Sequence, residues 1–223
     1  FKLLGLQEVI SYNVVAYAVN SIGEIVSEPV IFTTEANDEV IEYEYVDLGL
    51  PSGVKWAMHN VGTTYPEGHG DYFAWGEIEP KATYESGNCS SYNQDLGDIS
   101  GNPLYDAAAA KWGNGWRMPT LEEMYELTQE CTWTWVEDNG IVGYKVTSKT
   151  NGNHIFLPAA GFRVNDQLLD KDFFGYYWMS TPYEEEGAEP TLNKACFLDM
   201  CSYQFYCNWS LRRNGMTIRP VKD

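Results

Sequence analysis

Two short runs that alternate between apolar and polar residues open the chain and predict a β-hairpin. Residues 12–20 form a β-rich run, residues 21–23 supply a Ser-Ile-Gly turn, and residues 29–34 form a second strand. Residues 36–44 are acidic and have the composition of a linker. The pattern therefore divides the chain into an N-terminal hairpin segment over residues 1–35, a linker over residues 36–44 and a larger domain over residues 45–223.

Turn signals are frequent in the larger domain. Four Asn-Gly dipeptides occur, and both residue types favour the positive φ of tight hairpin turns; they begin at Asn114, Asn139, Asn151 and Asn214. Around the middle two, residues 132–137, 141–148 and 154–157 have the pattern of strands and predict an antiparallel meander. The last dipeptide is expected to join residues 209–213 to residues 216–221 in a further hairpin.

Only two segments have the pattern of helices. Residues 103–112 have Pro near the start, four consecutive alanines and Gly113 just past the end. The second helix begins with a capping box between Thr120 and Glu123, and one face of it carries Leu121, Met124, Leu127 and Cys131. Two helices ahead of a run of hairpins predict an α+β domain, and the lack of strand–helix–strand alternation argues against a parallel sheet.

Charge and cysteine content narrow the classes of partner. The 223 residues include 32 acidic and 14 basic ones, which gives a formal charge of −18. Nucleic acids and anionic membrane surfaces both require a basic face, so neither is expected as a partner. No apolar run approaches the roughly 20 residues that span a bilayer. Five cysteines without a CxxC motif leave the redox compartment and the disulfide pairing open.

The N-terminal hairpin resembles the last two strands of a fibronectin type III domain. The resemblance rests on the spacing of Leu6, Tyr12, Val14 and Ala16, followed by Asn20 and a Phe-Thr-Thr run. Leu6 and Tyr12 stand where that family carries its tyrosine corner. An unrelated hairpin is the alternative. Two strands without a covering sheet would expose apolar side chains, so an intermolecular contact through residues 1–35 is expected.

The larger domain carries long motifs in a characteristic order: YVDLGLPSGVKWA (45–57), GDYFAWGE (70–77), DAAAAKWGNGWRMPTLEEMYEL (106–127), CTWTW (131–135), GYKVTSKTNGNHIFLPAAGFR (143–163), YYWMSTP (176–182) and MTIRPV (216–221). This order resembles the Fibrobacter major paralogous domain family of surface lipoproteins from gut bacteria. The resemblance implies a C-type-lectin-like fold of the formylglycine-generating-enzyme type, with two helices and a twisted antiparallel sheet. It also implies an extracellular or outer-membrane location, with a lipid anchor in a region ahead of Phe1.

Most motif residues are expected to serve the fold. Five tryptophans are expected in the core: Trp56, Trp75, Trp112, Trp116 and Trp178. Arg117 and Arg219 stand between apolar neighbours, so each guanidinium must find carboxylates or carbonyls and join loops. Four glycines are expected where a Cβ would not fit: Gly49, Gly53, Gly76 and Gly161.

Two kinds of site chemistry receive little support. The three histidines stand in no hydrolase motif, and a glycosidase carboxylate pair remains open because acids are so numerous. Formylglycine-generating oxidases use a cysteine pair, and Cys196 and Cys201 have a CxxxxC spacing, but the flanking residues of those enzymes are absent. We therefore assign no catalytic residue.

A calcium-dependent lectin would need a Glu-Pro-Asn or Gln-Pro-Asp motif together with a Trp-Asn-Asp motif. The chain has Glu-Pro-Thr at 189–191 and no Trp-Asn-Asp, so that site is expected to be absent. Asn93, Asp95 and Asp98 could ligate a structural calcium, although a solvated acidic loop is the commoner outcome. No other metal or cofactor is expected.

The favoured interpretation is a non-catalytic binding or adhesion module for a protein or a glycan. Residues 202–210 carry no charge in a chain of −18 and are rich in Tyr, Ser, Asn and Trp, a composition typical of antibody paratopes. A core strand with alternate buried residues is the alternative. The predicted ligand-binding residues are Tyr183, Tyr203, Tyr206, Asn208 and Trp209.

Overall fold

The structure is a computed structural model that describes residues 11–33, 42–185, 187 and 191–223. The chain divides into two compact units, Phe1–Glu42 and Tyr43–Asp223. Tyr43 belongs to the second unit because its ring stacks on Trp112, with the centroids 3.8 Å apart and the planes 6° from parallel. Each unit is described by itself below.

The first unit is a two-stranded antiparallel ribbon with one interruption. β1 (Ser11–Val14) pairs with β4 (Val30–Thr33), and β2 (Tyr17–Asn20) pairs with β3 (Gly23–Val26). Each of the two predicted strands is therefore broken into two, and Ser27 fills the break by bonding Ala16 through both its backbone N–H and its hydroxyl. Tyr12 stacks on Phe32 at 5.9 Å. Leu6, the other half of the expected tyrosine corner, lies outside the described residues, as do residues 36–41 of the expected linker.

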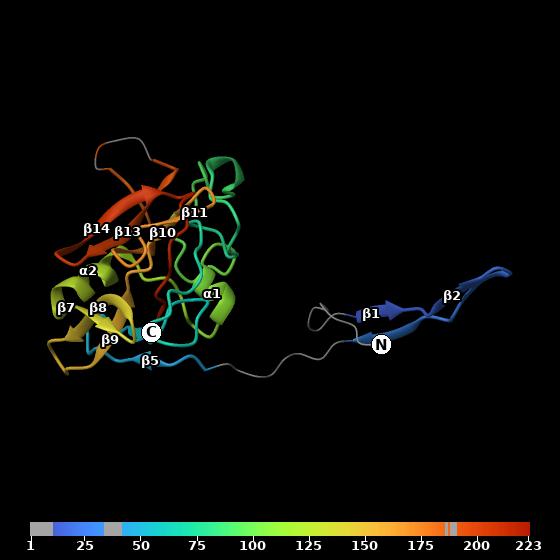
Figure 1. Ribbon diagram of the computed structural model, residues 1–223, viewed down its shortest axis with the longest axis horizontal. Coiled ribbons are helices and arrows are strands. Elements are labelled where there is room, and N and C mark those ends of the chain that lie inside the picture. The colour runs from blue at the N-terminus through green and yellow to red at the C-terminus, as the bar shows by residue number, and fades with distance from the viewer. Residues whose placement is uncertain (1–10, 34–41, 186, 188–190) are drawn as a thin grey trace. The chain divides into compact units, whose positions relative to one another are not determined.

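The second unit contains short strands, two short α-helices and much ordered loop (Figure 1). The helices are η1 (Ser86–Asn88, a 3-10 helix), α1 (Ala107–Trp112) and α2 (Leu121–Glu130). The strands are β5 (Tyr45–Val46), β6 (Lys55–Ala57), β7 (Cys131–Asp138), β8 (Ile141–Ser148), β9 (His154–Pro158), β10 (Phe162–Val164), β11 (Gln167–Leu169), β12 (Phe174–Pro182), β13 (Lys194–Cys201), β14 (Gln204–Leu211) and β15 (Val221–Lys222).

The α+β class predicted from the sequence is wrong. The described structure is mostly β, with 41% of residues in strands and 10% in helices. The strands form several small sheets, ordered β7–β8–β9, β12–β13–β14, β15–β6–β5 and β10–β11, and the C-type-lectin fold is not clearly shown. The physical reason is that the two helices span only 6 and 10 residues, whereas five strands span 8 or 9 residues each and several shorter strands pair around them.

Local signals predicted several elements correctly. The meander is confirmed as β7–β8–β9, with Asn139 and Gly140 both at positive φ in its first turn. The capping box at the start of α2 is confirmed, since Thr120 and Glu123 exchange hydrogen bonds. The first helix is shorter than predicted because Asp106 caps it, accepting hydrogen bonds from the N–H groups of Ala108 and Ala109.

The C-terminal hairpin prediction is wrong. β14 pairs with β13 instead of with residues 216–221, and neither Asn214 nor Gly215 has positive φ. The segment after Gly215 is shared among several partners: Met216 bridges to Phe73, Thr217 to Tyr177 and Val221 to Trp56. Tertiary pairing at these positions thus overrides the local turn signal.

The central strand of the β12–β13–β14 sheet, β13, is buried on both faces and separates two hydrophobic clusters. Residues of β13 at even positions, Cys196, Leu198 and Met200, pack into a cluster with α2 and the meander. Those at odd positions, Ala195 and Phe197, pack into a second cluster. α2 contacts β14, β12 and β13 and therefore lies against this sheet, and it also contacts β7. Figure 1 shows α2 between β7 and the β13–β14 hairpin.

The tryptophans and arginines expected to serve the fold do so, and among the four glycines the exception is Gly53, which has open space where a Cβ would stand. All five tryptophans are buried. Arg219, fully buried, donates to Asn60 Oδ1 and to the carbonyls of Ala57, Met58 and Phe156. Arg117 pairs with Glu123 and Asp223. A Cβ at Gly161 would stand 2.2 Å from the Leu169 carbonyl oxygen, whereas nothing lies within 4 Å at Gly53, whose requirement is its φ of +80°.

Candidate functional site

A groove of about 490 Å³ opens where β14 meets the N-terminal end of α2 and the end of β12. Three aromatic side chains, two carboxylates and two thiols line it; its residues are Gly97, Asp98, Leu121, Tyr125, Thr181, Pro182, Tyr183, Glu184, Cys196, Cys207, Asn208 and Trp209. None of these residues is a lysine, an arginine or a histidine. The groove therefore combines apolar surface with negative charge.

A chain of hydrogen bonds fixes one wall of the groove. The Thr181 hydroxyl donates to Asp98 Oδ2 at 2.9 Å and accepts the N–H of Leu121 at 3.0 Å. Asp98 Oδ1 accepts the N–H of Ser100 at 2.9 Å. These contacts join a loop, the end of β12 and the first turn of α2, so the wall holds its shape before any ligand arrives.

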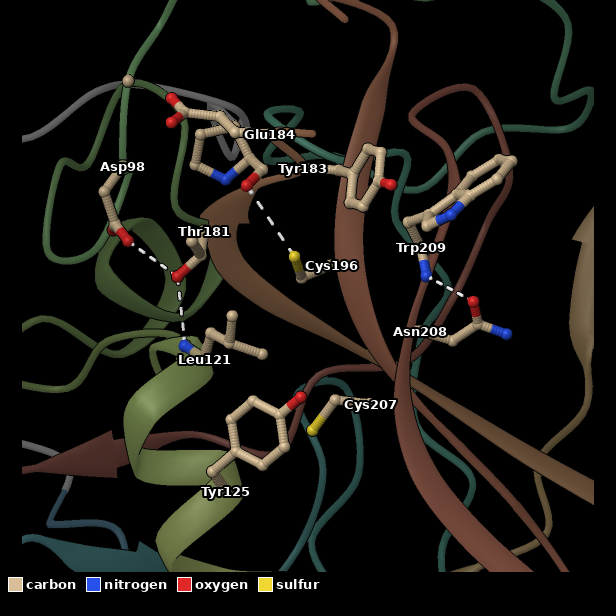
Figure 2. A pocket seen from close by; sticks show the side chains of 12 residues that line it. Asp98, Leu121, Tyr125, Thr181, Tyr183, Glu184, Cys196, Cys207, Asn208 and Trp209 are labelled. Carbon is tan, nitrogen blue, oxygen red and sulfur yellow. Dashed lines mark hydrogen bonds between the residues drawn. The ribbon is translucent and has the colours of Figure 1, made fainter. Parts of the chain in front are cut away.

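The opposite side of the groove is aromatic (Figure 2). The rings of Tyr183 and Trp209 lie 5.3 Å apart, with an angle of 35° between their planes. The ammonium group of Lys194 lies 3.6 Å from the centroid of the Trp209 ring and 5.5 Å from that of Tyr183. Both distances fall within the range of a cation–π interaction. This aromatic pair already holds a cation supplied by the chain itself.

Cys196 and Cys207 form part of the groove floor between its two sides (Figure 2). Cys196 pairs across the strands with Trp209, and Cys207 pairs with Leu198, so the two thiols are diagonal neighbours on one face. Burial raises the pKa of Cys196 to about 11 and that of Cys207 to about 12. Both thiols therefore stay protonated near neutral pH, and the floor is apolar rather than nucleophilic.

Three of the five predicted binding residues, Tyr183, Asn208 and Trp209, border this groove. Alternation along β14 turns the Asn208 side chain toward Asp199, so the groove-facing side chains among them are Tyr183 and Trp209. The Asn208 Oδ1 accepts the Trp209 N–H at 2.8 Å. Tyr206 pairs with Asp199, and because side chains alternate along a strand, it points to the opposite face of β14 from Trp209. Tyr203 lies in the turn between β13 and β14 and is 76% exposed.

The Asp199 face holds its own polar cluster. Burial raises the pKa of the Asp199 carboxyl, and hydrogen bonds from Tyr206 and Asn208 oppose that rise. The neighbouring Asp199 charge in turn raises the pKa of Tyr206. Tyr206 is therefore engaged with Asp199 and contributes nothing to the aromatic side of the groove.

Sequence reasoning missed the contribution of α2 to the site. Leu121 and Tyr125 are four residues apart and so share one helix face, and both line the groove. The available sequence signal was a tyrosine four residues after Leu121 in the predicted helix, and the structure leaves its ring 51% exposed. The two carboxylates, Asp98 and Glu184, come from segments more than 80 residues apart, so no local pattern pointed to their meeting.

The cysteine spacing that suggested an oxidase does not produce a thiol pair. Cys196 and Cys201 are five residues apart on β13, which places them on opposite faces and about 16 Å apart along the strand. All five cysteines are free thiols in the structure.

The candidate calcium ligands do not converge. Asp98 is occupied with Ser100 and Thr181, and the described residues include no group of three or more His, Cys, Asp or Glu side chains that could hold a metal ion. Glu189 and Pro190 of the Glu-Pro-Thr sequence lie outside the described residues. Among the helices that the structure describes, none is long and apolar enough to cross a membrane.

Comparisons with known proteins leave the function to be argued from this geometry. A scan against protein-family models, a search of curated proteins and a search of solved structures each found no match to the chain.

Proposed function

We propose that this chain is a non-catalytic binding module, displayed outside the cell, that holds a protein or glycan ligand in the groove between β14 and α2. The observation that carries the proposal is the aromatic side of that groove. Tyr125, Tyr183 and Trp209 present partly exposed rings beside two carboxylates, and hydrogen bonds from Ser100 and Thr181 fix that of Asp98. Rigid aromatic surface next to oriented polar groups is typical of ligand-binding sites.

The charge and the family resemblance support the same function. A formal charge of −18 disfavours polyanionic partners and suits a surface that meets neutral or basic ones. The motifs of residues 45–221 resemble a family of surface lipoproteins, which supports a place outside the cell. The protonated thiols and the separated cysteines offer no activated nucleophile in the groove.

The test uses two exposed aromatic residues on the same strand as a matched pair. Trp209 and Tyr206 are 41% and 42% exposed, but only Trp209 lines the groove. The full chain is first screened on glycan and peptide arrays, and each ligand found is then titrated by calorimetry. An anchoring aromatic carries about 2 kcal/mol, so Trp209→Ala should weaken binding by about 30-fold while Tyr206→Ala leaves it unchanged. Equal losses in both variants, or none in Trp209→Ala, would contradict the proposal.

A further inference from the structure

The Lys194 ammonium, which lies over the Tyr183–Trp209 pair, has no role in the binding function proposed above. Lys194 is the first residue of β13, and its position, two residues before Cys196, places its side chain on the groove face of the sheet. Its ammonium lies against Trp209 and Tyr183 but is not among the groove-lining groups. The chain thus shows by its own side chain that this pair of rings accepts a primary ammonium.

The rest of the groove is complementary to positive charge. Among the described residues that line it, Asp98 and Glu184 are the carboxylates and none is basic. Each Asp98 oxygen accepts one hydrogen bond, from Ser100 or from Thr181, so each keeps a lone pair for a further donor. The negative field reaches the floor as well, because the charges of Glu122 and Asp98 add to the effect of burial in raising the pKa of Cys196.

We propose that the groove recognises a basic side chain of a partner protein, a lysine or an arginine, and that Lys194 occupies the Tyr183–Trp209 pair as an intramolecular competitor. This inference rests on the proposed function and names the ligand class of the same groove. The ligand cation replaces Lys194 on the rings, and its neighbouring donors reach Asp98 and Glu184. Lys194 begins its strand and has a flexible four-carbon stem, so it can turn toward solvent when it is displaced.

Displacement has a modest cost. A cation–π contact at an exposed site is weak, so removing the competitor should strengthen binding of a basic ligand by about two- to five-fold. The sign of this effect separates the proposal from its rivals. A glycan or an acidic peptide that used the Lys194 ammonium as a hydrogen-bond donor would bind more weakly once the lysine was removed.

The experiment titrates the full chain with three short peptides that differ at one residue. The probes are acetyl-Gly-Lys-Gly-amide, the same peptide with norleucine in place of lysine, and the same peptide with glutamate. Norleucine keeps the apolar stem without the charge. Binding is read from the NMR signal of the Trp209 indole N–H, assigned by its loss in Trp209→Phe. The lysine peptide should shift this signal, the other two should not, and added salt should weaken the effect.

The variants Lys194→Ser and Lys171→Ser remove the same charge at two places. Lys171 is exposed and does not line the groove, so only Lys194→Ser should tighten binding of the lysine peptide. The inference is overturned if norleucine binds as tightly as lysine, if Lys194→Ser weakens binding, or if no peptide shifts the Trp209 signal. A neutral oligosaccharide from the array that shifts this signal independently of salt and of Lys194 would also overturn it, while the binding function of the groove would stand.

Discussion

Two cation–aromatic pairs lie near the end of the β13–β14 hairpin, and they have opposite surroundings. The Arg212 guanidinium lies 4.0 Å from the centroid of the Trp75 ring, and both residues are 1% exposed. Arg212 donates to the carbonyls of Lys194, Ser91 and Gln94, and the Trp75 indole donates to the carbonyl of Met179. The pair of Lys194 and Trp209 has the same chemistry, but Trp209 is 41% exposed and borders a groove.

The comparison teaches that burial decides what a cation–aromatic contact does. The Nε and Nη1 groups of Arg212 donate to three backbone carbonyls, and burial lowers the pKa of the guanidinium to about 10. Moving the Arg212 guanidinium away would leave several buried carbonyl oxygens without a hydrogen-bond donor, so Arg212 holds the loops together throughout the folded state. The Lys194 ammonium faces no comparable cost, because water can replace its contacts. The Arg212–Trp75 pair therefore stabilises the fold, whereas the cation of the Lys194–Trp209 pair can be replaced by another.

The largest expected effect is a difference in stability between variants of Trp75 and Trp209. Trp75→Ala should lower the free energy of unfolding by about 3–5 kcal/mol, because it leaves a cavity in the core. Trp209→Ala removes a ring that is partly solvated and should cost less than about 1 kcal/mol. Urea denaturation followed by circular dichroism measures both. If the two variants lost equal stability, Trp209 would be a core residue and the comparison would fail.

A second prediction removes the charge from the buried Arg212–Trp75 pair. Arg212→Met keeps apolar volume but leaves three carbonyl acceptors without their donor, so we expect a loss of about 3 kcal/mol or more. The neighbouring Arg213→Met is the control, since Arg213 is only half-buried, and its cost should stay within about 0.5 kcal/mol. The same denaturation measurement applies. Equal midpoints for the two variants would show that the Arg212 hydrogen bonds do not stabilise the fold.

The smallest expected effect concerns the first unit. The four residues of the two cation–aromatic pairs lie in the second unit, and so does every residue of the described hydrophobic clusters. Deleting residues 1–42 should change its free energy of unfolding by no more than about 0.5 kcal/mol. Tyr17, Val19, Ile22 and Ile25 of the ribbon are strongly exposed, so any self-association of the full chain should disappear with the deletion. Failure of the shortened chain to fold would show that the ribbon completes the core.

Local chemistry explains what could be predicted from the sequence. The capping box at Thr120 and the turn at Asn139 depend on residues within four positions of each other, and the structure contains both. The two-strand N-terminal pattern and the meander follow from alternation over short runs. The buried state of Trp56 and Trp178 follows from their size and their apolar neighbours. In each case the determining contact is close in sequence.

The features that the sequence did not predict depend on pairing between residues that are distant in sequence. Asn214-Gly215 has the sequence of a hairpin turn, yet Gly215 bonds Arg163 and Met216 bonds Phe73. The α+β class was wrong because helix signals are easy to recognise, whereas the short strands β5, β6 and β15 become visible only through their partners. In the groove, alternation along β14 separates Tyr206 from Trp209, because residues 204–211 form a strand, which from the sequence was only the alternative to a paratope-like segment.

The pairing of β15 with β6 has a consequence for how the second unit comes into being. Lys222 pairs with Lys55, and Arg219 holds the carbonyls of residues 57, 58 and 156. The Lys222–Lys55 pairing and the Arg219 bonds to residues 57 and 58 join the two ends of the unit across more than 150 residues of chain. Folding rates fall as such long-range contacts come to dominate. During synthesis, residues 43–215 therefore emerge from the ribosome before the strand that completes their sheet. A chaperone that covers their exposed apolar surface at that stage should raise the yield of folded protein.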